Sequence, residues 1–256
     1  MSFARLFGKS EESAPRAPAE TPAGTRVYAI GDIHGQLDQL RALEAKIAAD
    51  AAGSGAERRV IVYLGDYIDR GEDSAGTVAH LLAGPPEGFE AVHLIGNHEA
   101  LLLDFLDDPD SGGNWLVNGG DSTLASYGVD IEEDPPVTVP RLVHLSRRFA
   151  AALPRSHRRF LETLSLRHDE GGYLFVHAGV RPGVELEAQD PEDLIWIRYP
   201  FLQSSADFGK VVVHGHTPER EPVERDNRIG IDTGAVYGGR LTALVLDGAE
   251  RRYLQA

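Results

Sequence analysis

Short runs of apolar residues recur along the chain from residue 26 onwards. Their length and their content of valine, isoleucine and leucine predict β-strands at residues 26–30, 60–64, 91–95, 173–176, 211–213, 229–231 and 241–246. Several of these runs are apolar throughout, which is typical of strands that are buried on both faces. We therefore expect helices or a second sheet to cover each face of the predicted sheet.

Apolar residues spaced by three or four positions predict helices between the strands. One face of the first such helix carries Leu37, Leu40, Leu43 and Ile47, and further helices are predicted at residues 75–82, 100–106, 141–153 and 154–164. Ser74 is a candidate N-cap, and Pro154 suits a first helical position. The glycine-rich residues 112–120 predict a loop. The order β-α-β-α-β followed by a strand-rich end predicts an α/β layered domain.

The first 25 residues differ from the rest in composition. Residues 9–25 consist of small, polar and proline residues without a large apolar side chain, which predicts a flexible tail at residues 1–25 and one folded domain at residues 26–256. Residues 1–10 lack the apolar stretch of a secretory signal, and no apolar run is long enough to span a membrane. We therefore expect a cytoplasmic protein.

The charge and the missing cysteines restrict the chemistry. The chain has 25 Lys and Arg against 40 Asp and Glu, and this net charge of −15 argues against broad nucleic-acid binding. With no cysteine, a metal would have to be held by His, Asp, Asn or Glu. A mixed set of imidazole and oxygen donors favours Mn, Fe or Zn over Mg or Ca.

Polar clusters follow five of the predicted strands. Their sequences are GDIHG (31–35), GDYIDRG (65–71), GNHE (96–99), HAG (177–179) and HGHT (214–217). Ligands of layered α/β folds collect at the carboxyl ends of the strands, so these clusters should meet in space. They offer six donor side chains, which are Asp32, His34, Asp66, Asn97, His177 and His216. Six donors suit two metal ions better than one tetrahedral site, and Asp66 could bridge the two ions.

Further residues in these clusters suit phosphate chemistry. His98 could protonate a leaving oxygen, with Asp69 orienting it. Arg70 and Arg198 offer planar donor groups that match phosphate oxygens, although Arg198 could instead stack on a neighbouring aromatic ring. Phosphate esters are therefore the expected substrates.

Together these motifs resemble the phosphoprotein phosphatase (PPP) family of calcineurin-like metallophosphoesterases, and the resemblance extends over about residues 26–246. It implies a four-layer α-β-β-α sandwich with a dinuclear metal site at the carboxyl ends of the strands. It also implies the residue roles. Asp32, His34 and the bridging Asp66 match the ligands of one metal, and Asp66, Asn97, His177 and His216 match those of the other. His98 matches the general acid and Asp69 its partner, while Arg70 matches a phosphate clamp and Arg198 resembles the second clamp of the bacterial and phage branch. We further expect Asn97 to hold a phosphoryl oxygen together with these arginines.

Some positions bear on the substrate within that family. Pro218 stands where many wider metallophosphoesterases have another histidine, and the HAG motif is similar to that of bacterial members. Related diadenosine tetraphosphate hydrolases typically have GNHD and an alanine at the position of Asp69, so GNHE and the complete DRG motif resemble a protein phosphatase more closely.

The sequence thus predicts a bacterial-type phosphatase that removes phosphate from phosphoserine and phosphothreonine in proteins, with phosphotyrosine as a further substrate. The resemblance implies direct attack by a metal-bridging hydroxide and two divalent ions, for which we expect Mn²⁺, with Fe or Zn as alternatives. One alternative is a hydrolase of dinucleoside polyphosphates or RNA caps with the same metals, and another is a catalytically silent metal-binding module. His214 and Tyr237 are expected beside the site rather than in it, and residues 115–127 form either a cap over the cleft or a plain surface loop. The remaining histidines should be dispensable, namely His80, His93, His144, His157 and His168.

Overall fold

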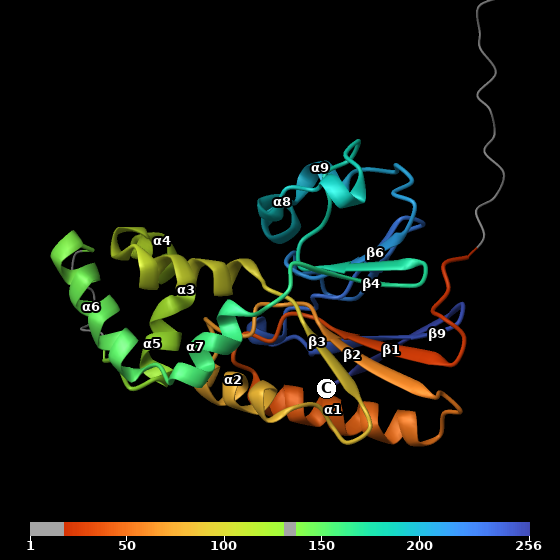
Figure 1. Ribbon diagram of the computed structural model, residues 1–256, viewed down its shortest axis with the longest axis horizontal. Helices are drawn as coiled ribbons and strands as arrows, with labels where there is room; N and C mark the ends of the chain where they lie inside the picture. Colours follow the sequence, from red (N-terminus) through yellow and green to blue (C-terminus); the bar gives the residue numbers. More distant parts are fainter. Residues whose placement is uncertain (1–17, 131–136) are drawn as a thin grey trace, which may run out of the picture.

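The computed structural model describes residues 18–130 and 137–256, which form two five-stranded sheets packed face to face (Figure 1). The first sheet has the strand order β10-β9-β1-β2-β3. Its strands are β1 (Thr25–Ile30), β2 (Arg58–Tyr63), β3 (Glu90–His93), β9 (Thr242–Asp247) and β10 (Glu250–Gln255). The strands β1, β2 and β3 are parallel, and β9 runs antiparallel to both β1 and β10.

The second sheet has the strand order β4-β5-β6-β8-β7. Its strands are β4 (Arg167–Glu170), β5 (Tyr173–Val176), β6 (Val211–His214), β7 (Val223–Glu224) and β8 (Arg228–Gly230). The three central strands are parallel, and the two edge strands are antiparallel to their neighbours. Each sheet therefore has a parallel segment whose loops can carry a site at its carboxyl end.

Helices cover the outer faces of both sheets (Figure 1). The helices α1 (Leu37–Ala52) and α2 (Ser74–Ala83) pack on the first sheet, and the short helices α8 (Pro191–Trp196) and α9 (Tyr199–Leu202) pack on the second. A further group gathers at one end of the molecule and comprises α3 (Asn97–Asp107), α4 (Gly112–Trp115), α5 (Asp121–Ser126), α6 (Val139–Ala152) and α7 (Arg155–Glu162). The predicted four-layer sandwich is confirmed.

The layers explain why the strands are apolar on both faces. In β1, Val27 and Ala29 point into the core between the two sheets, whereas Tyr28 and Ile30 point to the core beneath the helices. In β5, Phe175 belongs to the core between the sheets and Leu174 to the core under α8 and α9. Because successive side chains of a strand alternate between the faces, a strand inside the sandwich needs apolar residues at every position.

The sequence did not predict β4, β7 and β10, and all three are edge strands. Their sequences, RHDE, VE and ERRYLQ, are mostly polar because an edge strand exposes part of its surface to water. The seven predicted strands are all present, with bounds that differ by up to two residues.

The predicted loop at residues 112–120 is wrong. The chain forms α4 there, followed by a π-helical turn at Leu116–Gly120 and by α5. The glycines permit close packing in this region, since a Cβ on Gly112 would lie 2.3 Å from the Phe105 ring. The predicted N-cap of α2 is also wrong, because the side chain of Asp73, not Ser74, accepts from the N–H of Gly76.

The predicted tail at residues 1–25 is partly corrected, and residues 1–17 lie outside the described residues. Ala19 packs into the core between the sheets, and its carbonyl accepts a hydrogen bond from the Tyr173 hydroxyl (2.9 Å). Thr21 is buried and pairs with Gly248 through both its backbone and its hydroxyl. These contacts use small side chains and backbone groups, so composition alone did not predict them.

The described residues contain no helix that is both long and apolar enough to cross a membrane.

We predict that Thr21→Val destabilises the protein. The Thr21 hydroxyl donates to the carbonyl of Thr25 (2.8 Å) and accepts from the N–H of Gly248 (2.8 Å), and valine can do neither. Leaving these groups without a partner should lower the free energy of unfolding by about 1–3 kcal/mol in urea denaturation. Thr21→Ser keeps the hydroxyl and is the matched control. Equal stability of the valine variant and the wild type would show that the hydroxyl of Thr21 does not stabilise the fold.

Candidate active site

Six polar side chains meet at the carboxyl ends of the parallel strands. Asp32 and His34 follow β1, Asp66 follows β2, Asn97 begins α3 just after β3, and His177 and His216 follow β5 and β6. All six are buried, with exposed fractions of 5% or less. These are the six donors that the sequence predicts, and the two sheets each contribute some of them.

The carboxylate of Asp66 lies at the centre of this group. Its Oδ2 is 3.3 Å from Nε2 of His177, 3.6 Å from Nε2 of His34 and 3.9 Å from Nε2 of His98. Two sets of potential metal ligands share it: His34, Asp66 and His98 form one, and Asp66, His177 and His216 form the other. A carboxylate common to two ligand sets is placed to bridge two ions.

Asp32 and Asn97 complete the group without belonging to either set. Both carboxylate oxygens of Asp32 accept from the N–H of His216, at 3.2 and 3.0 Å. The side-chain oxygen of Asn97 lies 3.0 Å from Nε2 of His177. Both residues are therefore in contact with a predicted ligand.

Backbone carbonyls fix the orientation of two of the imidazoles. Nδ1 of His34 donates to the carbonyl of Ile68 (2.8 Å), and Nδ1 of His177 donates to the carbonyl of Leu64 (2.9 Å). This hydrogen bond directs Nε2 of each ring towards Asp66, as in proteins whose histidines bind metals.

Burial and charge set the protonation of the cluster. Burial lowers the pKa of His34 to about 3 and that of His216 to about 2, so both rings are neutral, as metal ligands must be. Burial works against ionisation of Asp66, but the charge of His177 and its other histidine neighbours outweighs burial and holds the pKa of Asp66 well below its usual range. Burial likewise opposes a charged His177, yet Asp66 raises the pKa of His177 to about 10, so a cation that binds at Nε2 would have to displace a proton from this ring.

The residues present fit two divalent cations. Imidazole, carboxylate and amide donors converge, and burial together with the charge of Asp232 raises the pKa of Asp32 well above its usual range. Such an excess of buried acid is relieved by a bound cation. Two glycines make room for the carboxylates, since a Cβ on Gly96 would lie 2.1 Å from Oδ1 of Asp66 and one on Gly215 would lie 2.0 Å from Oδ1 of Asp32.

The backbone around these ligands is strained. Among the described residues, the non-glycine residues with a positive φ are His34, Asp66, Asp69, Arg70 and His216, at 46° to 71°. All five are predicted site residues. Residues in this region of φ cost free energy and persist only where the surrounding structure holds them.

Glu99 holds part of this strained backbone, a role that the sequence did not predict. Its carboxylate accepts from the N–H groups of Asp66 (2.8 Å), Tyr67 (2.7 Å) and Gly96 (2.9 Å). Burial and the neighbouring charge of Asp66 raise the pKa of Glu99 to about 7. The GNHE motif contains this residue, but only the folded chain shows that it ties the loop after β2 to the start of α3.

His98 and Asp69 form a buried pair. Nδ1 of His98 lies 2.7 Å from Oδ2 of Asp69, as the sequence predicts for an acid and its orienting partner. Burial disfavours a charged His98, but Asp66 and Asp69 outweigh it and raise the pKa of His98. The same hydrogen bond leaves Nε2 of His98 facing the ligand cluster. His98 can therefore hold a proton beside the metal ligands.

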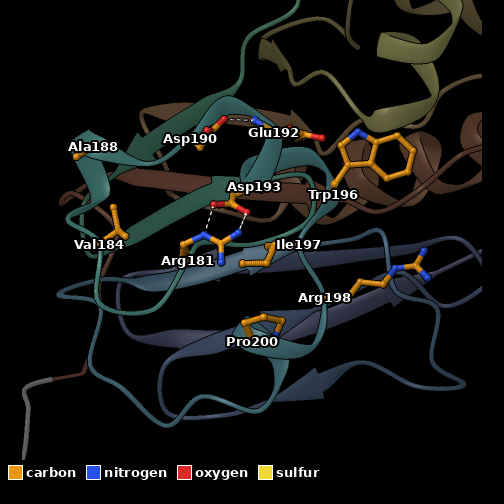
Figure 2. A pocket seen from close by; sticks show the side chains of 10 residues that line it. All are labelled: Arg181, Val184, Ala188, Asp190, Glu192, Asp193, Trp196, Ile197, Arg198 and Pro200. Carbon is orange, nitrogen blue, oxygen red and sulfur yellow. Dashed lines mark hydrogen bonds and ion pairs between the residues drawn. The ribbon is translucent and has the colours of Figure 1, made fainter. Parts of the chain in front are cut away.

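The two arginines contact imidazoles of the ligand cluster. Nη1 of Arg70 donates to Nε2 of His34 (2.8 Å), and Nε of Arg198 donates to Nε2 of His216 (3.0 Å). Arg198 also lines a pocket of about 640 Å³ between α8, α9 and the loop before α8, shown in Figure 2 together with Trp196. Both guanidinium groups thus lie beside the candidate metal ligands.

Sequence comparison places this geometry in a known family. Residues 25–239 match the profile of the calcineurin-like phosphoesterases. The chain belongs to this family. It is 31% identical over 224 residues to serine/threonine-protein phosphatase 1 of Salmonella typhimurium, covering 84% of this chain and 89% of that protein. It is 29% identical over 236 residues to the bis(5'-nucleosyl)-tetraphosphatase PrpE of Bacillus thuringiensis, covering 84% and 88%.

The fold of this phosphoesterase also matches a solved structure. The cold-active protein-tyrosine phosphatase of the psychrophile Shewanella sp. superposes with a TM-score of 0.58 at 17% identity, covering 92% of this chain and 83% of that one. The names of the two sequence relatives specify different substrates. The family match therefore assigns phosphoester hydrolysis to the chain, and the structural match supports its fold.

His214 and Tyr237 lie beside the phosphoesterase site. His214 is buried, its Nδ1 donates to the carbonyl of Gly215 (3.0 Å), and burial lowers its pKa to about 4. Tyr237 is 64% exposed, and its ring lies 5.8 Å from the guanidinium carbon of Arg70. His93 stacks on Tyr63, and within the described ranges none of the histidines expected to be dispensable belongs to the two ligand sets.

We predict that Asp66→Asn abolishes metal binding by the phosphoesterase. Asp66 is the residue that the two ligand sets share, so a neutral side chain should weaken both sets together. Titration with Mn²⁺, followed by isothermal calorimetry and by elemental analysis after gel filtration, should show loss of both ions. Asp226→Asn makes the same charge change at an exposed position and is the control. An unchanged metal content in the Asp66 variant would exclude the bridging role.

Proposed function

We propose that this phosphoesterase removes phosphate from phosphoserine and phosphothreonine residues of proteins, with Mn²⁺ as its metal. The observation that supports this proposal is the buried pair of His98 and Asp69. The alkoxide of serine or threonine is a poor leaving group, so its departure gains from a proton donor. A nucleotide or phosphate leaves a polyphosphate chain as a stable anion and gains less from such a donor.

Six residues would hold the metal ions, namely Asp32, His34, Asp66, Asn97, His177 and His216. When bound there, two divalent ions supply an activated water as nucleophile and neutralise charge on the phosphoryl group. The rest of the chemistry falls to side chains of the chain itself.

Arg70 and Arg198 bind the phosphoryl oxygens. Their guanidinium groups already contact His34 and His216, so little movement brings them to a phosphate beside these rings. Asn97 can donate from its side-chain amide to a third oxygen. These groups orient the ester and stabilise the negative charge of the transition state.

His98 protonates the leaving group. The oxygen of water forms the new bond to phosphorus, the bond to the serine or threonine oxygen breaks, and its electron pair stays on that oxygen. Nε2 of His98 then donates a proton to the leaving oxygen, while Asp69 holds the ring through Nδ1. The attacking water loses one proton to the solvent, and His98 takes one proton up from the solvent, so the number of protons balances and the enzyme returns to its starting state.

A second candidate is the hydrolysis of dinucleoside polyphosphates. It is supported by the similarity to the bis(5'-nucleosyl)-tetraphosphatase PrpE and by the exposed ring of Tyr237 beside Arg70. An exposed aromatic ring next to a phosphate-binding arginine could stack on a nucleobase. The metal ligands would be the same for both substrates.

We predict metal-dependent activity that favours the phosphopeptide. Protein treated with a chelator should be inactive, and added Mn²⁺ should restore phosphate release from a phosphothreonine peptide. The kcat/KM on this peptide should exceed that on diadenosine tetraphosphate. A preference for the dinucleotide would favour the second candidate. Inactivity on the phosphopeptide, the dinucleotide and p-nitrophenyl phosphate would contradict both candidate functions.

We predict that His98→Asn lowers kcat on the phosphopeptide by roughly 10²–10⁴, because the variant has no proton to donate from this position. His98 lies in one of the two geometric ligand sets but is not among the six residues proposed to hold the ions, so the metal content should stay near that of the wild type. His144→Asn, at a histidine outside the candidate site, is the control. A fully active His98 variant would exclude this residue as the acid.

A further inference from the structure

The helical residues 112–126, called here the 112–126 segment, enclose the carboxylate of Asp69. Oδ1 of Asp69 accepts from the hydroxyl of Thr123 (2.6 Å), and Oδ2 accepts from Nε1 of Trp115 (2.9 Å) and from Nδ1 of His98 (2.7 Å). Asp69, Trp115 and Thr123 are all fully buried. Water cannot replace these donors, so the chain itself supplies every hydrogen bond of this carboxylate.

Trp115 is held firmly in its place. Its ring packs against Phe105 (centroids 5.0 Å apart) and Phe149 (5.7 Å). Gly120 lies so close to the indole that a Cβ there would be 2.5 Å from the ring. The Nε1–H of Trp115 therefore has a fixed position from which to donate to Asp69.

The 112–126 segment also holds the backbone that carries Asp69 and Arg70. The N–H of Asp69 donates to the hydroxyl of Thr123 (2.9 Å), and the N–H of Arg70 donates to the carbonyl of Gly119 (3.1 Å). Both Asp69 and Arg70 have the positive φ noted above. The segment thus stabilises a strained turn that carries one residue of the acid pair and one phosphate-binding arginine.

We propose that Trp115 and Thr123 are positioning residues for catalysis, which hold the Asp69 carboxylate so that His98 can deliver its proton to the leaving oxygen. The inference rests on the proposed role of His98. A carboxylate with three fixed donors has one preferred rotation, and this rotation sets the plane and the tautomer of the His98 ring. Without the Trp115 and Thr123 donors, the carboxylate turns towards other partners and the ring loses its alignment. A misplacement of this kind is costly in proton transfer.

The test uses two conservative substitutions and a pair of aryl phosphates. Trp115→Phe keeps the ring packing but removes the Nε1–H, and Thr123→Val keeps the side-chain shape but removes the hydroxyl. Phenyl phosphate has a more basic leaving group than p-nitrophenyl phosphate and depends more on the acid. With Mn²⁺-loaded protein, each variant should lose about 10–100-fold in kcat on phenyl phosphate and less than about 3-fold on p-nitrophenyl phosphate, with KM unchanged. Thr123→Ser should restore most of the lost rate.

Two further variants separate the possible causes. Tyr127→Phe removes a hydrogen bond to His157 (2.8 Å) just beyond the same segment without touching Asp69, so it should affect neither substrate. His98→Asn removes the acid itself, so it gives the largest expected difference between the losses in kcat on phenyl phosphate and on p-nitrophenyl phosphate. Equal losses on both phosphates in the Trp115 and Thr123 variants, at unchanged circular dichroism and metal content, would overturn the positioning role alone. If His98→Asn itself showed no dependence on the leaving group, the proposed acid would fail and the inference with it.

Discussion

The carboxylate of Asp66 is a negative charge in the middle of the protein, with only 2% of the residue exposed. Burying such a charge costs several kcal/mol unless nearby groups compensate it. Three imidazoles lie within 3.9 Å of its Oδ2, and the N–H of His98 donates to its Oδ1 at 3.1 Å. Much of the local structure serves to place these groups. Asp32, Glu99 and Asp232 add further buried carboxyl groups, so the imidazoles alone do not compensate the negative charge at this site. Divalent cations would supply the missing positive charge.

The sandwich makes this concentration of polar groups possible. Apolar strands covered on both faces form a rigid support, and the loops at their carboxyl ends can then adopt conformations that a free chain avoids. The strained backbone persists where hydrogen bonds from other parts of the chain hold it in place. Glu99 ties the loop after β2 to α3, and the 112–126 segment ties the turn at Asp69 and Arg70. The same contacts that stabilise the loops therefore also aim the functional side chains.

The sequence predicts those parts of the structure that follow from local pattern. Apolar runs locate the buried strands, and the polar motifs after them locate the ligands, because both the alternation of a strand and the meeting of strand ends follow from backbone geometry. Polar edge strands such as β10 carry no such pattern. Trp115 and Thr123 are more than 40 residues from Asp69 along the chain, and nothing in the local sequence links them. The packing of Ala19 uses a methyl and a carbonyl group, which composition does not reveal.

The unfavourable burial of the Asp69 carboxylate beside His98 bears on the choice between the two candidate substrates. Burial raises the pKa of Asp69, while hydrogen bonds from His98, Thr123 and Trp115 counteract the rise. Trp115 and Thr123, both in the 112–126 segment, thus help to keep the carboxylate of Asp69 charged and oriented. A polyphosphate anion leaves readily without a proton, so a general acid would accelerate its departure only a little. An alkoxide leaving group benefits far more from a proton donor, and this difference is the ground on which we propose phosphate esters of serine and threonine rather than phosphoanhydrides as substrates.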